Sequence, residues 1–147
     1  MIQYVTMQDT HVEQIATLEK ECFADPWSVN AITSELHNPL SLWLVALDGD
    51  RVVGYVGSQS VLDGADVMNL AVSGEYRRRG VARQLMLLLE EKLKDKGVWM
   101  LALEVRVSNT AAISLYESLG FSQVGRRPRY YTNPREDAFI LRKEWQL

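Results

Sequence analysis

Three arginines and a glycine stand directly before the most regular helical pattern of the chain. Residues 77–82 read Arg-Arg-Arg-Gly-Val-Ala, and apolar residues then recur at helical spacing until Gly97. The first turn of a helix exposes unpaired backbone N–H groups and carries a partial positive charge, which together can bind a phosphate. The small residues Gly80 and Ala82 let a ligand approach the backbone, and the arginines add charge. The segment therefore indicates a site for a phosphorylated ligand.

An ordinary helix start with a solvated run of arginines explains the same segment equally well. Short motifs often match by chance, and this one lacks both the Lys-Ser/Thr pair of a P-loop and the Gly-x-Gly-x-x-Gly of a dinucleotide site. Taken alone, residues 77–82 leave both interpretations open.

A single carboxylate interrupts the apolar pattern of residues 98–107. Leucine, valine and tryptophan alternate there with methionine and alanine, so both faces of the expected strand are largely apolar apart from Glu104. Such a carboxylate costs free energy unless it is paired, hydrated or used. We interpret Glu104 as a general base. The alternatives are a salt bridge to an arginine such as Arg106 or Arg129, or simple exposure near the strand end.

Few other residues suggest nucleophilic or metal chemistry. Cys22 is the only cysteine, which excludes an internal disulfide and fits a reducing compartment. A cysteine can carry an acyl group, but Cys22 falls on the apolar face of the first expected helix, so we expect an inert core thiol. His11 and His37 lack the spacing of metal ligands and are expected at the surface. We expect no metal site.

Length and composition predict one globular domain over residues 1–147. The net charge is −3, and 47% of the residues are hydrophobic. The N-terminus does not resemble a signal peptide, and no apolar run reaches the roughly 20 residues of a membrane helix. We therefore expect a soluble cytoplasmic protein with no membrane partner.

A second arginine-rich segment lies near the C-terminus. Arg126, Arg127 and Arg129 precede Tyr130 and Tyr131, a composition found both in nucleic-acid contacts and in solvated loops. Because the chain is negatively charged overall, we expect no nucleic-acid partner and interpret the segment as a loop that borders an acceptor cleft.

Hydrophobic periodicity predicts the element order β-α-α-β-β-β-α-β-α-β-β. Ser28 is the expected N-cap of the second helix, and Asp48-Gly49-Asp50 the expected hairpin turn. The strand–helix–strand unit of residues 66–107 should be parallel and the other strands antiparallel. The fold class is thus α/β (α+β), with a mixed, mostly antiparallel sheet covered by helices. The expected strands are residues 2–6, 42–47, 52–61, 66–72, 98–107, 121–125 and 138–143, and the expected helices residues 9–23, 29–36, 80–96 and 110–119.

Several spaced motifs resemble the GNAT superfamily of acetyltransferases. Arg77-x-x-Gly80-x-Ala82 is similar to its acetyl-CoA motif, Arg/Gln-x-x-Gly-x-Gly/Ala, and residues 103–121 resemble the second half of its domain. More narrowly, the chain resembles the bacterial ribosomal-protein-alanine N-acetyltransferases, the RimI group. The matching motifs are Phe-Ala-Asp-Pro-Trp-Ser at 23–28, Arg-Tyr-Tyr at 129–131 and Arg-Glu-Asp-Ala at 135–138. Outside residues 23–28, the first third of the chain resembles this group only loosely.

The resemblance implies a GNAT fold, acetyl-CoA as cosubstrate and direct attack by an amine in a ternary complex, without an acyl-enzyme. The acceptor would be the N-terminal α-amino group of a ribosomal protein that starts with alanine. Glu104 would be the base, and Tyr116, which on spacing alone is a core residue, would protonate the leaving sulfur. A bulge in the strand of residues 69–72 would free backbone groups. The residues implied to contact acetyl-CoA are Leu70, Ala71, Val72, Arg78, Arg79, Gly80, Val81, Ala82, Arg83 and Asn109.

Two other functions stay open. A GNAT enzyme with the same cofactor site could acetylate lysine side chains or small amines, although a lysine amine, with a pKa of about 10.4, asks more of a base than an α-amine at about 7.7–8.0. A CoA-binding module without turnover belongs to a different class. The presence of both Glu104 and Tyr116 argues against it, because binding alone needs neither.

Overall fold

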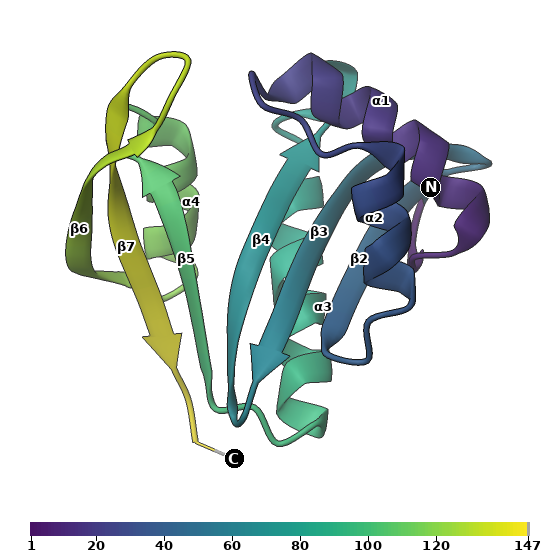
Figure 1. The fold of residues 1–147 in the computed structure, drawn as a ribbon. Coiled ribbons are helices and arrows are strands. Elements are labelled where there is room, and N and C mark those ends of the chain that lie inside the picture. Colours follow the sequence, from purple (N-terminus) through teal and green to yellow (C-terminus); the bar gives the residue numbers. More distant parts are fainter. Residues whose placement is uncertain (147) are drawn as a thin grey trace.

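Seven strands form one mixed sheet in the computed structural model, which describes residues 1–146 (Figure 1). The strands hydrogen-bond in the order β1-β2-β3-β4-β5-β7-β6. Only β4 and β5 run parallel within this described sheet, and the other neighbours are antiparallel, which confirms the predicted arrangement. The strands are β1 (Ile2–Thr6), β2 (Ser41–Asp48), β3 (Arg51–Val61), β4 (Gly64–Val72), β5 (Met100–Arg106), β6 (Ser122–Tyr131) and β7 (Glu136–Glu144).

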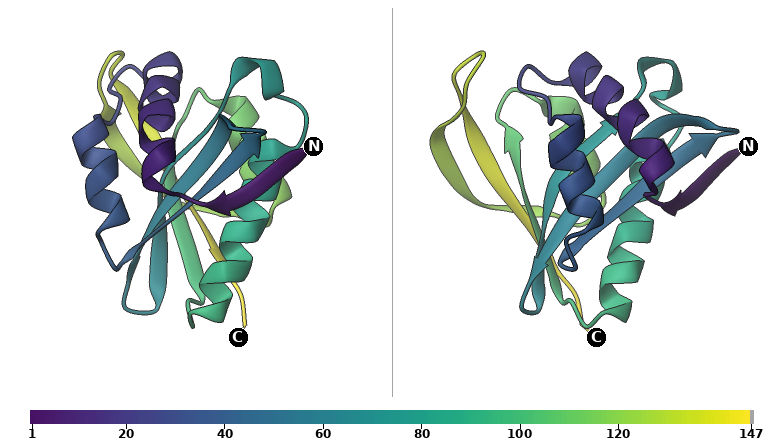
Figure 2. Two further views of the ribbon diagram at one scale, coloured as in Figure 1. Left: turned by 90° about the vertical axis from the view of Figure 1, so that its right-hand side faces the viewer. Right: turned by 45° about the vertical axis from the view of Figure 1, so that its right-hand side comes forward.

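Helices cover both faces of this sheet, as Figure 2 shows from two further sides. The helices are α1 (Val12–Cys22), α2 (Val29–Leu36), α3 (Val81–Asp95) and α4 (Thr110–Ser118), with single 3-10 turns at Asp9–His11 and Gly74–Tyr76. One face carries α1 and α2, and the other carries α3 and α4. Each pair closes a separate hydrophobic core, so the sheet is buried on both sides along its middle strands.

Local sequence accounts for most of these elements. The stripe of Leu85, Leu89 and Leu93 on α3 is fully buried, and the helix ends before Gly97, whose φ of 82° only glycine adopts readily. At the start of α2, the Ser28 hydroxyl accepts a hydrogen bond of 3.1 Å from the backbone N–H of Ala31. The predicted element order is confirmed throughout.

A bulge divides β4 into two parts with different partners. Gly57 of β3 pairs with Asn69 of β4, but the next residue, Ser58, pairs with Val67. Met68 is therefore the extra residue of the bulge. Only residues 64–66 of β4 pair with β5. Beyond them the two strands separate, and within the described chain residues 67–72 have no strand partner on that side (Figure 1).

Two details differ from the sequence expectations. The last two strands are longer than predicted, and residues 126–131, interpreted from sequence as a loop, belong to β6 although their side chains lack apolar alternation. His11 was expected at the surface but is only 9% exposed, and its Nδ1 accepts the backbone N–H of Gln8 at 3.0 Å. Glu19 lies on the apolar face of α1 and is completely buried. None of the helices in the described part of the chain has the length and apolar character needed to cross a membrane.

Candidate active site

A cavity of about 390 Å³ opens at the first turn of α3. Its walls come from three neighbouring segments: the end of β4 with the turn after it, the start of α3, and α4. The lining residues include Val72, Arg77, Gly80, Ala82 and Leu115. The structure thus brings the arginine–glycine segment together with the separated end of β4 and with the helix that carries Tyr116.

The backbone at the start of α3 is open to a ligand. Gly80 is the N-cap residue, with a φ of 78°, and no side chain caps the helix. A β-carbon at Gly80 would meet no atom within 4 Å, so the space beside it is free. No acidic residue occupies the first turn. Uncapped N–H groups at a positive helix end, facing free space, fit a phosphate group.

The four arginines of this segment have different surroundings. Arg77 is turned toward the protein, where its Nε donates to the carbonyl of Val72 at 3.2 Å. The guanidinium of Arg79 lies 5.0 Å from the centre of the Tyr76 ring. Arg83 donates to the Ser118 hydroxyl of α4 at 2.9 Å. Arg78 is exposed, with a φ of 63°. Arg78, which also lines the cavity, is therefore better placed than Arg77 to meet an anion from solvent.

Residues 70–72 present mainly backbone to the space between β4 and β5. Leu70 and Val72 pack toward α3, whereas Ala71 is buried in the core under α1. Any contact from Ala71 must therefore be made by its main chain. On the other side of the gap, the Asn109 side chain accepts from the N–H of Ala112 at 3.2 Å and so caps α4. Its amide nitrogen is left to donate to a ligand.

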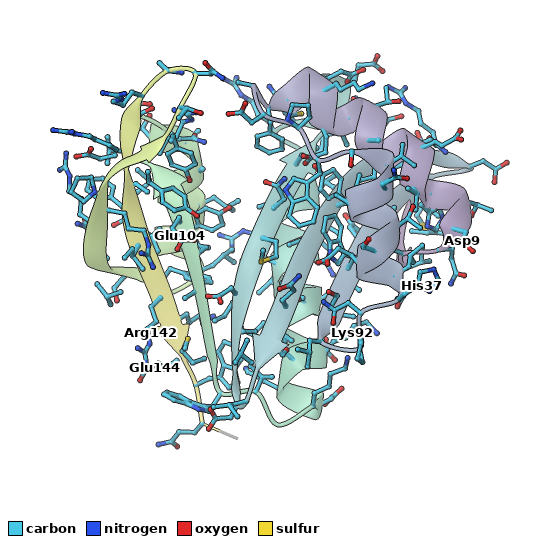
Figure 3. The ribbon with its side chains drawn as sticks, viewed as in Figure 1. Asp9, His37, Lys92, Glu104, Arg142 and Glu144 are labelled. Carbon is cyan, nitrogen blue, oxygen red and sulfur yellow. The ribbon has the colours of Figure 1, made fainter. Side chains whose placement is uncertain are left out.

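Glu104 lies half-buried on β5, beyond the three residues that still pair with β4 (Figure 3). Its Oε1 accepts from Nε of Arg127 on β6 at 3.3 Å. An ion pair was one of the sequence alternatives, but the expected partners were Arg106 and Arg129. Arg106 instead pairs with Glu136 at 3.1 Å. The Arg127 side chain is itself about half exposed, so solvent weakens its electrostatic attraction to Glu104.

Tyr116 is a buried core residue on α4 whose phenol has a raised pKa. Its ring packs edge-to-face on Phe121, with centroids 5.8 Å apart, and 7% of the residue is exposed. Burial, with a smaller contribution from Tyr131, raises the pKa of Tyr116 well above its ordinary value. The phenol therefore keeps its proton at neutral pH and remains a hydrogen-bond donor.

Tyr131 interacts electrostatically with both Glu104 and Tyr116. Burial raises the pKa of Tyr131 to about 12, with added contributions from Tyr130 and the Glu104 carboxylate. Tyr131 in turn adds to the raised pKa of Tyr116. Sequence reasoning placed Tyr131 only at the border of an acceptor cleft, and its interaction with both candidate catalytic residues could not be read from a motif.

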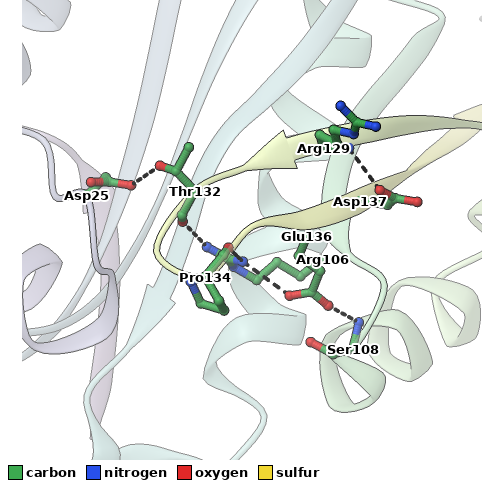
Figure 4. Close-up of polar contacts among 8 residues, drawn as sticks. All are labelled: Asp25, Arg106, Ser108, Arg129, Thr132, Pro134, Glu136 and Asp137. Carbon is green, nitrogen blue, oxygen red and sulfur yellow. Dashed lines mark hydrogen bonds and ion pairs between the residues drawn. The ribbon is translucent and has the colours of Figure 1, made fainter.

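The hairpin between β6 and β7 reaches across to the loop that joins α1 and α2. The Asp25 carboxylate accepts from the Thr132 hydroxyl at 3.2 Å and from the Asn133 amide at 3.3 Å. Figure 4 shows the hydrogen bond from Thr132 to Asp25 and the interactions of Arg106 with the same hairpin. Arg106 donates at 2.9 Å to the carbonyls of Thr132 and Pro134. Sequence reasoning assigned no role to Asp25, and it considered Arg106 only as a partner of Glu104.

Aromatic rings hold the α1–α2 loop on the sheet. Trp27 packs edge-on against Trp43 at 5.5 Å between centroids, and Trp43 stacks on Tyr55 at 5.8 Å. Gly57 leaves room for this stack, because a β-carbon there would lie 2.2 Å from the Trp43 ring. The Pro-Trp-Ser segment is thus fixed by packing against β2 and β3.

We refer to the cavity at the first turn of α3, together with the adjoining unpaired edge of β4, as the passage. An uncapped helix end and an unpaired strand edge can hold a phosphorylated, extended ligand. Glu104, a carboxylate that can accept a proton, lies beyond the last residue of β5 that pairs with β4, and Tyr116, a neutral phenol that can donate one, lies on α4, which lines the cavity. This combination suits transfer of a group from a phosphorylated carrier to a nucleophile that must lose a proton. Within residues 1–146, no cluster of His, Cys, Asp or Glu has the composition of a metal site.

Comparisons with known proteins agree with this arrangement. The model of the Acetyltransferase (GNAT) family matches residues 12–121. The [Ribosomal protein bS18]-alanine N-acetyltransferase of Escherichia coli (strain K12) is 37% identical over 138 residues, which cover 92% of this chain and 93% of that protein. The crystal structure of the ribosomal-protein-S18-alanine N-acetyltransferase from Escherichia coli superposes with a TM-score of 0.92 at 35% identity, covering 100% of this chain and 96% of the other.

One relative is much longer than this chain. The uncharacterized protein ML0378 of Mycobacterium leprae (strain TN) is 37% identical over 147 residues. That alignment covers 96% of this chain but only 40% of the Mycobacterium leprae protein.

Proposed function

The chain belongs to the GNAT family of acetyltransferases, and on that premise we propose that it acetylates the N-terminal α-amino group of a ribosomal protein that begins with alanine. Acetyl-CoA is the acetyl donor. The observation that supports the proposal is the position of Glu104 on β5, just past the residues that pair with β4, in a chain similar over almost its whole length to an enzyme named for this reaction. Ribosomal proteins are made in the cytoplasm, where we place the activity.

The first turn of α3 and the free edge of β4 are proposed to hold acetyl-CoA, whose thioester supplies the activated acyl group. The open backbone at Gly80 supports a pyrophosphate contact, and the exposed Arg78 and Arg79 support contacts to its charge. Residues 1–147 act in this proposal as one catalytic domain, because a single continuous sheet joins both walls. The full set proposed to contact the cosubstrate is Leu70, Ala71, Val72, Arg78, Arg79, Gly80, Val81, Ala82, Arg83 and Asn109.

Glu104 and Tyr116 then act on the two protons of the reaction. Glu104 accepts a proton from the acceptor amine, whose ordinary pKa of roughly 7.7–8.0 makes a carboxylate a sufficient base near neutral pH. The amine attacks directly, without a covalent enzyme intermediate. Tyr116, kept neutral by its burial, donates a proton to the departing sulfur. The pair in this way avoids both a protonated nucleophile and a free thiolate.

Peptide acetylation tests the proposal. We expect CoA release from acetyl-CoA with a short peptide that begins with alanine, and a mass increase of one acetyl group at its N-terminus. The same peptide with a blocked N-terminus and an internal lysine should remain unmodified. Equal modification of the lysine would favour a lysine or small-amine acetyltransferase, and tight acetyl-CoA binding without turnover on any amine would favour a binding module.

A further inference from the structure

Glu19 is a buried carboxylate for which the proposed reaction has no use. It lies on α1 within the core formed by Ile15 and its neighbours, and none of its surface is exposed. Among residues 1–146, no lysine, arginine or histidine forms an ion pair with it. A buried carboxyl group without a cation is costly unless hydrogen bonds satisfy it.

Three hydrogen-bond donors satisfy Glu19, and each comes from a different part of the fold. Oε1 accepts the backbone N–H of Trp27 at 2.9 Å. Oε2 accepts the side-chain amide of Asn69 at 2.7 Å and the hydroxyl of Tyr55. The Trp27 and Asn69 groups can only donate to these oxygens, so the set favours a charged carboxylate. Burial raises the pKa of Glu19, and the hydrogen bonds from Trp27 and Tyr55 oppose that rise.

Two of these donors belong to the two parts between which we propose that the substrates meet: the α1–α2 loop, which with the β6–β7 hairpin would border the acceptor, and the strand edge that would hold acetyl-CoA. Trp27 directly precedes the N-cap of α2 and belongs to the α1–α2 loop, which contacts the β6–β7 hairpin through Asp25. Asn69 follows the bulge of β4, beyond which that strand leaves β5. One carboxyl group therefore joins the loop on the acceptor side to the strand edge on the acetyl-CoA side.

We infer that Glu19 is a positioning residue, which holds Trp27 and Asn69 in register so that the acceptor amine and the thioester meet at the distance that transfer requires. The inference rests on the proposed function. Its physical basis is that a misplacement of about 1 Å between reacting groups can cost roughly 100-fold in rate. A loop and a strand edge that move independently would lose that alignment without losing either binding site.

Glu35 offers a matched control. It is also a buried carboxylate, with 7% exposure, and it accepts from the side chains of Ser41, Trp43 and Gln59 at 2.9–3.2 Å. Trp43 contacts the α1–α2 loop through its ring, but the amide oxygen of Glu35→Gln can still accept from its Nε1, and none of the three donors belongs to the bulge of β4. Loss of Glu35 should therefore disturb packing to a similar degree without separating the two substrate sides.

The first experiment compares Glu19→Gln with Glu35→Gln by steady-state kinetics, well below the unfolding midpoint of each variant. Both substitutions should lower Tm. Only Glu19→Gln should lower kcat, by about 10- to 100-fold, and raise the KM of the alanine-starting peptide, with the Kd of acetyl-CoA nearly unchanged. Equal kcat values for the two variants would overturn the inference.

A rescue variant separates positioning from mere stability. In Glu19→Gln the new NH2 group faces the NH2 group of Asn69, and the two can bond only if the Asn69 side chain turns its oxygen toward position 19. Adding Asn69→Asp supplies an acceptor, so the double variant should recover at least part of kcat. If Glu19→Gln does not fold, Asn69→Ala removes only the strand end of the link and should lower kcat in the same direction. No recovery in the double variant, or normal kcat in Asn69→Ala, would contradict the role.

Hydrogen exchange gives a readout that does not depend on the acceptor. Exchange of the Trp27 backbone amide should accelerate in both Glu19→Gln and Asn69→Ala, and should be unchanged in Glu35→Gln. If no amine is acetylated, the proposed function fails, while this measurement still decides whether Glu19 couples the loop to the strand. Unchanged Trp27 exchange in Glu19→Gln and Asn69→Ala would disprove the coupling itself.

Discussion

The two walls of the passage are built in different ways. The donor wall proposed for acetyl-CoA, residues 69–83, is one continuous stretch of chain that presents backbone groups at an unpaired strand edge and an uncapped helix end. The acceptor wall proposed for the peptide combines the α1–α2 loop with the β6–β7 hairpin, and its contact from Asp25 to Thr132 spans 107 positions of sequence. A wall made of backbone tolerates most side-chain changes, whereas one made of long-range side-chain contacts depends on each of them. Substitutions in the donor wall should therefore change the affinity for acetyl-CoA, and substitutions in the acceptor wall should change the KM of the peptide.

The largest effect is expected where the walls meet, at Glu104. Glu104→Gln should lower kcat/KM by roughly 10²- to 10⁴-fold, because the amide cannot accept the amine proton. The loss should be greatest at lower pH, where more of the acceptor amine is protonated. Calorimetric titration should give an acetyl-CoA affinity close to that of the parent protein. A large loss of that affinity would place Glu104 in the donor wall instead.

Tyr116→Phe should have the next largest effect. The ring keeps its contact with Phe121, so Tm should change little, while kcat should fall by about 10- to 100-fold through loss of the proton donor. Thermal unfolding and peptide kinetics check the two halves of this prediction. Full activity with a normal Tm would leave Tyr116 as a core residue only.

Gly80 tests the donor wall by itself. Gly80→Val should weaken acetyl-CoA binding by about 10-fold or more, because its side chain occupies the free space beside the backbone and its φ becomes strained. Gly97→Val is the matched control, since Gly97 has a similar φ of 82°, equally open surroundings and a position at the other end of α3. Both variants should lose stability, but only the first should lose affinity in a titration. Equal affinities would remove the proposed pyrophosphate site.

Asp25 tests the acceptor wall by itself, with a smaller expected effect. Asp25→Ala removes both hydrogen bonds from the hairpin tip and should raise the peptide KM several-fold, since exposed bonds of this kind contribute about 0.5–1.5 kcal/mol each. The acetyl-CoA Kd should not change. A variant that weakened both substrates equally would argue that the walls are not independent.

The smallest expected effect is that of low pH, which should reduce the amide protection of the acceptor wall before that of α3. Hydrogen bonds from Ser108 lower the pKa of Glu136, and the backbone N–H of Arg129 lowers that of Asp137. Their stabilisation is complete above the ordinary carboxyl values of about 4 and is lost as pH falls through the lower folded-state values. Amide exchange at Ser108 and Arg129, corrected for intrinsic rates, should show less protection below about pH 4. Uniform loss of protection across α3 at the same pH would contradict this order.

The donor wall was largely predictable from sequence because its determinants are local. The apolar stripe of α3, the glycine before it and the strand preceding it occupy adjacent positions, so periodicity and one motif place them together. The bulge of β4 was expected only from the resemblance to a family. The residues that pair at the bulge, such as Asn69 with Gly57, are set by the register of the sheet. No local sequence pattern contains that register.

The acceptor wall was predicted less well because its determinants are tertiary. The β6 register against β7 shifts between Arg127 and Tyr131, and that shift decides which arginine meets Glu104. The sequence therefore indicated an ion pair but not its partner. The sequence did contain a signal for Glu19. It is a carboxylate among apolar helix positions, just as Glu104 is a carboxylate among apolar strand positions, and so it could have been considered for a function in the same way.

The absence of a side chain at position 57 affects the packing of residues outside its own strand, β3. Any larger residue there would push the Trp43 indole aside, and that indole supports Trp27 on one side and Tyr55 on the other. The absence of a β-carbon on this interior strand thus sets where the α1–α2 loop rests on the sheet, and under the proposed function a substitution at position 57 would alter the acceptor range without touching a substrate.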